Sequence, residues 1–287
     1  MKNPFNYRFC LVRNPSKSMA SNALRSCDDD SVDQTKAYAQ WTNYVNTLQK
    51  IPNMEVFVLP GDDDLPDCVF IEDTMLSVPM PNGATKVLIS FPGAITRQKE
   101  IIEIERFFEN NKDNMTGVEV ARLQDFNTEA RFEGGDCLFT GKEIFVGLSQ
   151  RSNIDAINVM QDYFAPYPVT GIPIEDLHLK STMSLLKDSP TTIISSKTKA
   201  GKFALNELKK VAKFEYEYAE VTDEDHAANV LFIDKGSEKF LVRQPNNQFF
   251  KTASKIDDLT TATVLEVNNS EVHKIDGCLT CCSVFIR

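Results

Sequence analysis

Four short segments carry the side chains best suited to chemistry. Each joins acidic, basic or thiol groups to an apolar run, so each could place a reactive group at the end of a buried element. They are residues 65–73 (LPDCVFIED), 133–136 (EGGD), 176–181 (DLHLKS) and 275–283 (IDGCLTCCS).

The first segment holds three carboxylates, Asp67, Glu72 and Asp73, around an apolar stretch. Buried carboxylates cost several kcal/mol each unless they are paired, so a bound cation would supply what they lack. The alternative is that these carboxylates are exposed at the edge of a surface strand, and composition alone favours this alternative.

A proton carrier and a second acid come next. His178 is one of only three histidines, with His226 and His273, and imidazole is the natural proton carrier near neutral pH. Glu133 precedes two glycines that let the backbone approach a neighbour closely. A structural histidine and a tight turn are the alternatives.

The last segment holds three thiols, Cys278, Cys281 and Cys282. Free cysteine is usually buried and inert, and a reactive thiolate needs a cationic neighbour. Together with His178 and Glu133, a cysteine here would complete a set of nucleophile, acid/base and orienting acid. Extra carboxylates beside such a set suit a planar guanidinium group.

Composition limits the class of protein. The chain has 287 residues, is 42% hydrophobic and carries a formal charge of −10, which is ordinary for a globular protein and unfavourable for nucleic-acid binding. The polar start resembles no signal peptide, and no apolar stretch is long enough to span a membrane. Seven cysteines, an odd number, favour reduced thiols and a cytoplasmic location, and no spacing indicates a structural zinc site.

Periodicity predicts alternating helices and strands. Helices are expected at 31–50 (with Ser31 as N-cap), 98–110, 154–164 (with Asn153 as N-cap) and 201–212, with a weaker one at 254–259. Strands are expected at 8–12, 55–59, 68–71, 87–91, 118–123, 137–139, 144–147, 191–194, 214–221, 230–233, 240–242, 264–267 and 282–286.

This pattern also repeats. Asp67, Glu133, His178, His226 and Asp276 mark similar points of five units, at intervals of 66, 45, 48 and 50 residues. Repeats of this length indicate supersecondary units arranged around a centre. We expect residues 1–287 to form one closed α/β domain in which the strand ends of all units face the middle.

The segments LPDCVFIED, FPGAITRQKE, EGGDCLFTGKEIFVGLSQRSN, DLHLKS and DGCLTCCSVFI, in this order, resemble dimethylarginine dimethylaminohydrolases of the guanidino-group-modifying (pentein) superfamily. The resemblance runs from about residue 8 to the C-terminus. It implies a five-bladed α/β-propeller of ββαβ units. It also implies hydrolysis of asymmetric dimethylarginine or monomethylarginine to citrulline and an amine, without a cofactor.

The resemblance implies a role for each matching residue. Cys281 is the expected nucleophile, His178 the general acid/base and Glu133 the acid that holds it, with no metal. The others hold substrate: Asp73, Glu72 and Asp276 at the guanidinium; Asp67 with the carbonyls near Leu24 and Ile275 at the α-amine; Arg97 and Arg151 at the α-carboxylate; Phe70 and Ser181 in the pocket wall.

Three features leave alternatives open. Residues 23–26 resemble a mobile lid that continues into the acidic run 27–30, either a solvated loop or an attractor of cations, and Cys278 stands where the family usually has an apolar residue. A Cys/His pair can also capture zinc as an inhibitor. The rivals are an arginine deiminase on the same fold and a regulatory paralogue without turnover.

Overall fold

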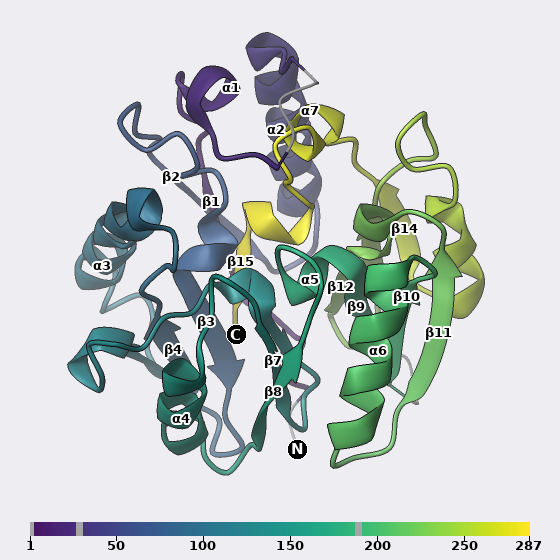
Figure 1. Cartoon of the computed structure of the whole chain (residues 1–287). Coiled ribbons are helices and arrows are strands. Elements are labelled where there is room, and N and C mark those ends of the chain that lie inside the picture. The colour runs from purple at the N-terminus through teal and green to yellow at the C-terminus, as the bar shows by residue number, and fades with distance from the viewer. Residues whose placement is uncertain (1–2, 27–30, 187–190) are drawn as a thin grey trace.

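The computed structural model describes residues 3–26, 31–186 and 191–287. Within these residues, fifteen strands form five three-stranded sheets around a common centre (Figure 1). In each sheet the middle strand runs antiparallel to an inner strand and parallel to an outer one. The unit is therefore ββαβ, which confirms the five-bladed α/β-propeller.

The blades follow one another along the chain, except that the last one combines both ends. Their strands are β3 (Met75–Pro79), β4 (Thr85–Ile89) and β5 (Val118–Arg122); β6 (Cys137–Phe139), β7 (Ile144–Leu148) and β8 (Val169–Pro173); β9 (Met183–Leu186), β10 (Thr192–Ser196) and β11 (Glu217–Thr222); β12 (Leu231–Asp234), β13 (Lys239–Arg243) and β14 (Thr263–Glu266); β15 (Val284–Ile286), β1 (Phe9–Arg13) and β2 (Glu55–Leu59).

A helical segment crosses from the middle to the outer strand of each blade. These crossovers are α2 (Gln34–Gln49), η2 with α3 (Ile95–Glu100, Ile101–Asn110), α4 (Ile154–Tyr163), α6 (Lys199–Val211) and η6 (Ala253–Leu259). Three short segments lie elsewhere: α1 (Met19–Asn22), η3 (Leu123–Asp125) and α7 (Ser270–His273).

The inner strand of every blade faces the centre. A cavity of about 160 Å³ is lined by residues of β3, β6, β9, β12 and β15, so these five strands surround one axis. A single helical turn comes directly before each inner strand and brings its side chains to the same end of that axis. The turns are η1 (Ile71–Thr74), η4 (Gly134–Asp136), α5 (Leu179–Thr182), η5 (Asp225–Ala228) and η7 (Thr280–Cys282).

Local sequence explains the longer crossover helices. Asp33, Asn153 and Thr198 each accept a hydrogen bond from a backbone N–H in the first turn of α2, α4 and α6, which satisfies a donor that the helix leaves open. In α3 the apolar residues at helical spacing are all buried: Ile101, Ile104, Phe107 and Phe108.

Several predicted elements differ from the structure. Residues 68–71 form turns instead of a strand, because Cys68 and Phe70 donate their N–H groups to carbonyls three residues back. Asp33, not Ser31, caps α2. The segment 254–259 is a 3₁₀ helix. The sequence patterns missed β3, β8 and β9.

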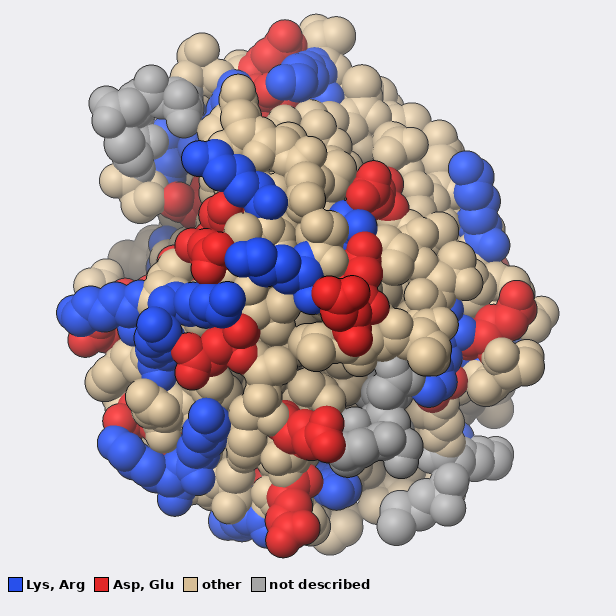
Figure 2. All heavy atoms as spheres, turned by 90° about the vertical axis from the view of Figure 1, so that its right-hand side faces the viewer, with Lys and Arg blue, Asp and Glu red and all other residues tan. Residues whose placement is uncertain are grey.

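Charges of both signs are interspersed over the face formed by the third and fourth blades (Figure 2). The negative net charge therefore does not make this face uniformly acidic. Among the described residues, no helix has the length and apolarity needed to cross a bilayer.

The central strands depend on fully buried aromatic side chains. Phe145 on β7 is 0% exposed, whereas Phe126 is 54% exposed. We expect Phe145→Ala to lower the free energy of unfolding by ~3–5 kcal/mol, because it removes buried area and leaves a cavity. Phe126→Ala should cost less than ~1 kcal/mol. Urea unfolding of both variants checks this, and similar losses would contradict it.

Candidate active site

A cavity of about 950 Å³ opens at the end of the axis where the five short turns meet. It gathers eleven of the thirteen residues predicted from the sequence. These are Leu24, Asp67, Phe70, Asp73, Arg97, Glu133, Arg151, His178, Ile275, Asp276 and Cys281.

A buried guanidinium organises the acids on one wall. Arg97, on η2, donates to Asp73 at 2.7 Å and to both carboxylate oxygens of Glu100 at 3.0 and 2.8 Å, and its Nη1 lies 3.8 Å from Glu133. It also donates to the carbonyl of Phe70. These contacts pair carboxylates that would otherwise be costly to bury.

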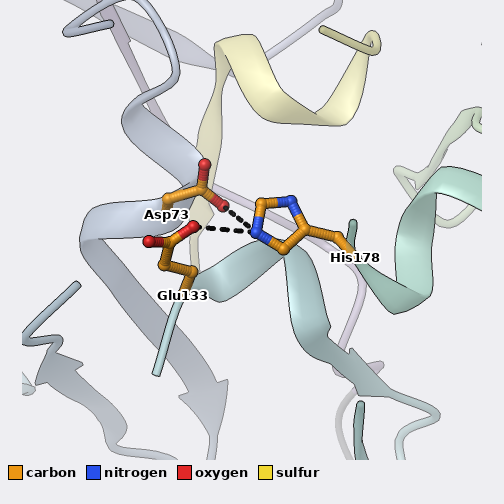
Figure 3. A group of neighbouring side chains, drawn as sticks. All are labelled: Asp73, Glu133 and His178. Atoms are coloured by element: carbon orange, nitrogen blue, oxygen red, sulfur yellow. Dashed lines mark hydrogen bonds and ion pairs between the residues drawn. The ribbon is translucent and has the colours of Figure 1, made fainter. Parts of the chain in front are cut away.

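The imidazole of His178 lies against two of the acids (Figure 3). Its Nε2 is 2.8 Å from Glu133 Oε2 and 3.9 Å from Asp73 Oδ1. Gly135 makes this approach possible: a Cβ there would lie 2.7 Å from His178 Nδ1 and 2.9 Å from Asp73 Oδ1. The glycine pair after Glu133 is thus explained by close approach.

The acids keep His178 cationic at neutral pH. Burial opposes the charged form, but the charge of Asp73, the hydrogen bond to Glu133 and the charge of Asp136 outweigh it and raise the pKa of His178 to about 10. Glu133 shows the complementary effect. Burial would raise its pKa, yet its hydrogen bond to His178 and the charge of Arg97 lower it to about 2.

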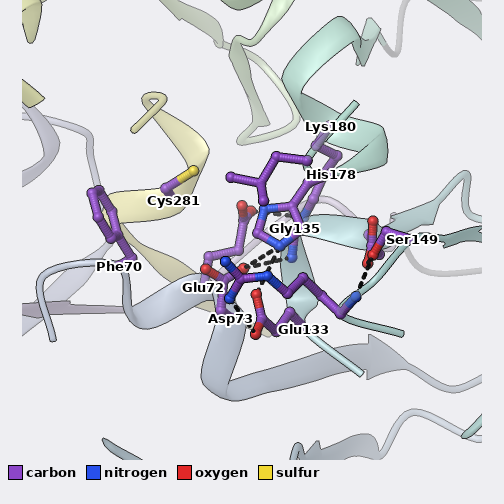
Figure 4. A network of polar contacts seen from close by, with 12 residues as sticks. Phe70, Glu72, Asp73, Glu133, Gly135, Ser149, His178, Lys180 and Cys281 are labelled. Carbon is purple, nitrogen blue, oxygen red and sulfur yellow. Dashed lines mark hydrogen bonds and ion pairs between the residues drawn. The ribbon is translucent and has the colours of Figure 1, made fainter. Parts of the chain in front are cut away.

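Cys281 lies on η7, directly before the inner strand of the last blade. In Figure 4 its side chain comes from the yellow segment, and His178 comes from the green segment that begins α5. The N–H of Cys278 donates to Cys281 Sγ at 3.4 Å. Cys281 and Cys282 are both buried, but the thiol of Cys282 donates to the carbonyl of Cys278 and Cys282 does not line the cavity.

The segment predicted as a lid reaches over the cavity. The N–H of Leu24 donates to Asp67 at 3.0 Å, and both the N–H and the hydroxyl of Ser26 donate to Asp276. Burial raises the pKa of Asp67, opposed by the charge of Arg97. The acidic run 27–30 lies outside the described residues.

Two predicted residues do not line this cavity. Glu72 turns away from it, accepting from Lys180 Nζ and Thr280 Oγ1 at 2.7 Å each. Ser181 is buried, and its N–H donates to the carbonyl of His178. Lys180 and Thr280 thus bind the carboxylate of Glu72 in place of the substrate guanidinium that the sequence predicts there.

The fourth blade adds a residue that had no predicted role. His226, on η5, lines the cavity, and its Nδ1 lies 2.7 Å from Nδ1 of His273. One ring must donate and the other accept, so the two atoms share one proton. His226 was a mark of the repeat, and its place beside Glu133 and His178 in that series was the available signal.

Asp73, Glu133 and His178 are also a possible ligand set for a metal, with ligand atoms within 4.8 Å of one another. However, Glu133 already pairs with His178, and Arg97 lies against both acids. The resident cations thus balance the charge that a metal ion would balance.

Comparison with known proteins adds the family. The family model described as "N,N dimethylarginine dimethylhydrolase, eukaryotic" matches residues 11–285. The chain belongs to this family. It is 31% identical over 280 residues to the "N(G),N(G)-dimethylarginine dimethylaminohydrolase" of Streptomyces coelicolor, covering 96% of both chains.

Solved structures share the fold of this dimethylarginine dimethylhydrolase family member. A mutant of the Pseudomonas aeruginosa enzyme complexed with citrulline matches with a TM-score of 0.76 at 24% identity, covering 98% of this chain and 100% of that one. The N-terminal domain of a cyanobacterial arginine dihydrolase, bound to substrate, also gives 0.76, at 16% identity over 96% and 97% of the two chains.

The His178–Glu133 pair predicts a pH response. Glu133→Gln should lower the pKa of His178 by at least about one pH unit, which corresponds to about 1.4 kcal/mol, because the carboxylate charge is lost. NMR titration of the imidazole measures this. Glu175→Gln, at the exposed rim of the same cavity, should leave the pKa unchanged. A Glu133→Gln titration that matches the wild type would contradict the pairing.

Proposed function

We propose that this chain hydrolyses asymmetric dimethylarginine or monomethylarginine to citrulline and dimethylamine or methylamine. The observation that carries the proposal is one cavity that joins a cysteine, a cationic histidine and several carboxylates. A cationic, planar guanidinium is the group that such acids bind best. Membership of the family and the citrulline complex of its structural relative support the same substrate class.

The distribution of charge suggests how the substrate lies. Asp73 would hold the guanidinium next to Cys281, since its carboxylate has accepting capacity beyond the bonds from Arg97 and Gly135. Asp276 would add a second acid when Ser26 releases it.

The other end of the substrate is an amino acid, which needs an acid and a base. Asp67, with the carbonyls of Leu24 and Ile275, would accept from the α-ammonium. Arg151 would bind the α-carboxylate, because only one hydrogen bond, at 3.3 Å to Glu133, engages its guanidinium among the described contacts. Arg97 would contribute mainly positive charge, since its own donors are bound to protein.

In the first step the Cys281 thiolate attacks the guanidino carbon. The substrate's own positive charge stabilises the thiolate, and a tetrahedral adduct forms. His178, cationic at neutral pH, donates a proton to the departing amine. The C–N bond breaks, and an S-alkylthiouronium on Cys281 remains.

The second step reverses the role of the histidine. Neutral His178 accepts one proton from water, whose oxygen attacks the same carbon. The C–S bond then breaks as the carbonyl forms, the second proton of that oxygen passes to solvent or to the released amine, and citrulline and the thiolate are released. Glu133 stabilises the imidazolium that forms again. Proton transfer of this kind contributes roughly 10²–10⁴-fold to the rate. The sequence of steps uses no cofactor and no metal.

We further propose a cytoplasmic, reducing setting. Six cysteines are free thiols in the described part of the chain: Cys10, Cys68, Cys137, Cys278, Cys281 and Cys282. A thiol nucleophile also requires conditions that keep it reduced. The partner we propose is a small molecule, methylated arginine, and not a nucleic acid.

The nucleophile is tested by the two adjacent cysteines. Cys281→Ala should lower the release of citrulline by at least ~10³-fold, because the covalent intermediate cannot form. Cys282→Ala is the matched control and should retain most activity, since its thiol lies outside the cavity. The measurement is amine release from asymmetric dimethylarginine beside free arginine.

The same assay separates the rivals. Dimethylamine release supports the proposal, whereas ammonia from arginine alone would favour the deiminase chemistry of the arginine dihydrolase relative. No product from either substrate would favour the regulatory paralogue. Activity lost in Cys282→Ala and kept in Cys281→Ala would exchange the two thiols.

The amine-binding role of Asp67 can be tested with a neighbouring acid as the control. Asp67→Asn should raise KM about 10- to 100-fold, the effect of losing a hydrogen bond to a charged group of ~1.5–3 kcal/mol, with a smaller effect on kcat. Asp64→Asn, three residues away and outside the cavity, should leave KM unchanged. Equal values for both variants would contradict the role.

A further inference from the structure

A second acid of the Glu-Gly-Gly-Asp segment lies behind the active site. Asp136, at the end of η4, is 0% exposed and does not line the cavity. Its Oδ1 accepts from the N–H of Leu179 at 3.1 Å, and its Oδ2 accepts from the hydroxyls of Ser149 and Ser152 at 2.6 Å each. One carboxylate therefore joins its own segment, residues 133–136, to residues 149–152 and to the start of α5.

Two of these bonds continue to site residues. The hydroxyl of Ser152 accepts from the N–H of Glu133 at 3.2 Å, and the hydroxyl of Ser149 accepts from the N–H of Arg151 at 2.9 Å. Each hydroxyl uses its single proton on Asp136, so its lone pairs point to these backbone donors.

The third bond ends beside the acid/base residue. Leu179 directly follows His178, so the bond to its N–H fixes the backbone from which the imidazole extends. Asp136 thus connects to the segments that carry the acid/base residue, its partner acid and a proposed substrate anchor.

We propose that Asp136 is a positioning residue: through its hydrogen bonds to Leu179, Ser149 and Ser152 it holds Glu133, His178 and Arg151 in register. This inference rests on the proposed function, because the register matters only if these three residues act together on one substrate.

The surroundings of Asp136 are adapted to an ionised carboxylate. A Cβ at Gly147, on the neighbouring β7, would lie 2.8 Å from Asp136 Oδ1, so this glycine leaves room for the side chain. Burial raises the pKa of Asp136 to about 6, which its three donors oppose, and the group is ionised at pH 8. Packing alone would be satisfied by an apolar residue at lower desolvation cost.

Other charged groups also act on His178. Asp73 on η1 lies 3.9 Å away, and Glu133 is hydrogen-bonded. The groups that face His178 or its partners are Asp73, Glu133, Asp136, Asp176, Arg97, Arg151 and Lys180. Removing the charge of Asp136 should therefore lower the pKa of His178. Because the other acids remain, that pKa should stay above the usual value of an imidazole.

The test is Asp136→Asn, which keeps the size and one acceptor but removes the charge. We expect kcat/KM for dimethylarginine to fall about 10- to 100-fold, because small displacements of reacting groups cost this much. We also expect the pKa of His178, measured by NMR titration, to fall. The signal is assigned by its loss in His178→Asn, since the chain has only three histidines.

The matched control is Glu143→Gln. Glu143 is an equally buried acid that accepts from the N–H of Lys213 and the hydroxyl of Tyr216, away from the cavity. This variant should lose stability in urea but keep the wild-type kcat/KM and the wild-type pKa of His178.

The outcomes separate this inference from the proposed function. If Asp136→Asn retains wild-type kcat/KM and an unchanged His178 pKa, or if Glu143→Gln changes both values equally, the positioning role is wrong. If the wild type releases no amine, the proposed function fails. The His178 titration still shows whether the charge of Asp136 acts on the imidazole, because this measurement needs no turnover.

Discussion

Charge pairing at the centre of the ring is the constraint on which the structure depends. Asp73, Glu100 and Glu133 are all buried, and each contacts the guanidinium of Arg97 or the imidazole of His178. Removing either cation would leave a buried acid uncompensated, which costs about 3–5 kcal/mol. The short turns must therefore meet in one arrangement, since shifting one would separate an acid from its cation.

The ring of repeats turns this constraint into a site. Each blade delivers one polar turn to the same end of the axis, and the chemistry differs from blade to blade. The first two turns bring acids, the third an imidazole and the last a thiol. A symmetric scaffold thus gives an asymmetric set of groups, and distant residues converge without a long loop.

Part of this arrangement can be predicted from the sequence, and the rest cannot. The helix predicted over 98–110 corresponds to α3, because its apolar residues recur at helical spacing, and the five marks about 50 residues apart indicate the ring. Residues 68–71 predict a strand although they form turns, because a buried turn is as apolar as a buried strand. Glu72 accepts hydrogen bonds from Lys180 and Thr280, which lie 108 and 208 residues away in the sequence. No local spacing could reveal these partners.

The last blade is built from both ends of the described chain: β15 pairs with β1, so that Phe9 lies opposite Ile286. Contacts between such distant residues are slow to form, because closing so long a loop costs conformational entropy before the contact stabilises it. Cys281 comes three residues before β15 and meets the acids and His178 only when this pairing closes the ring. A chain whose two ends are not paired therefore holds an unassisted thiol, and chemical competence requires that the ring be closed.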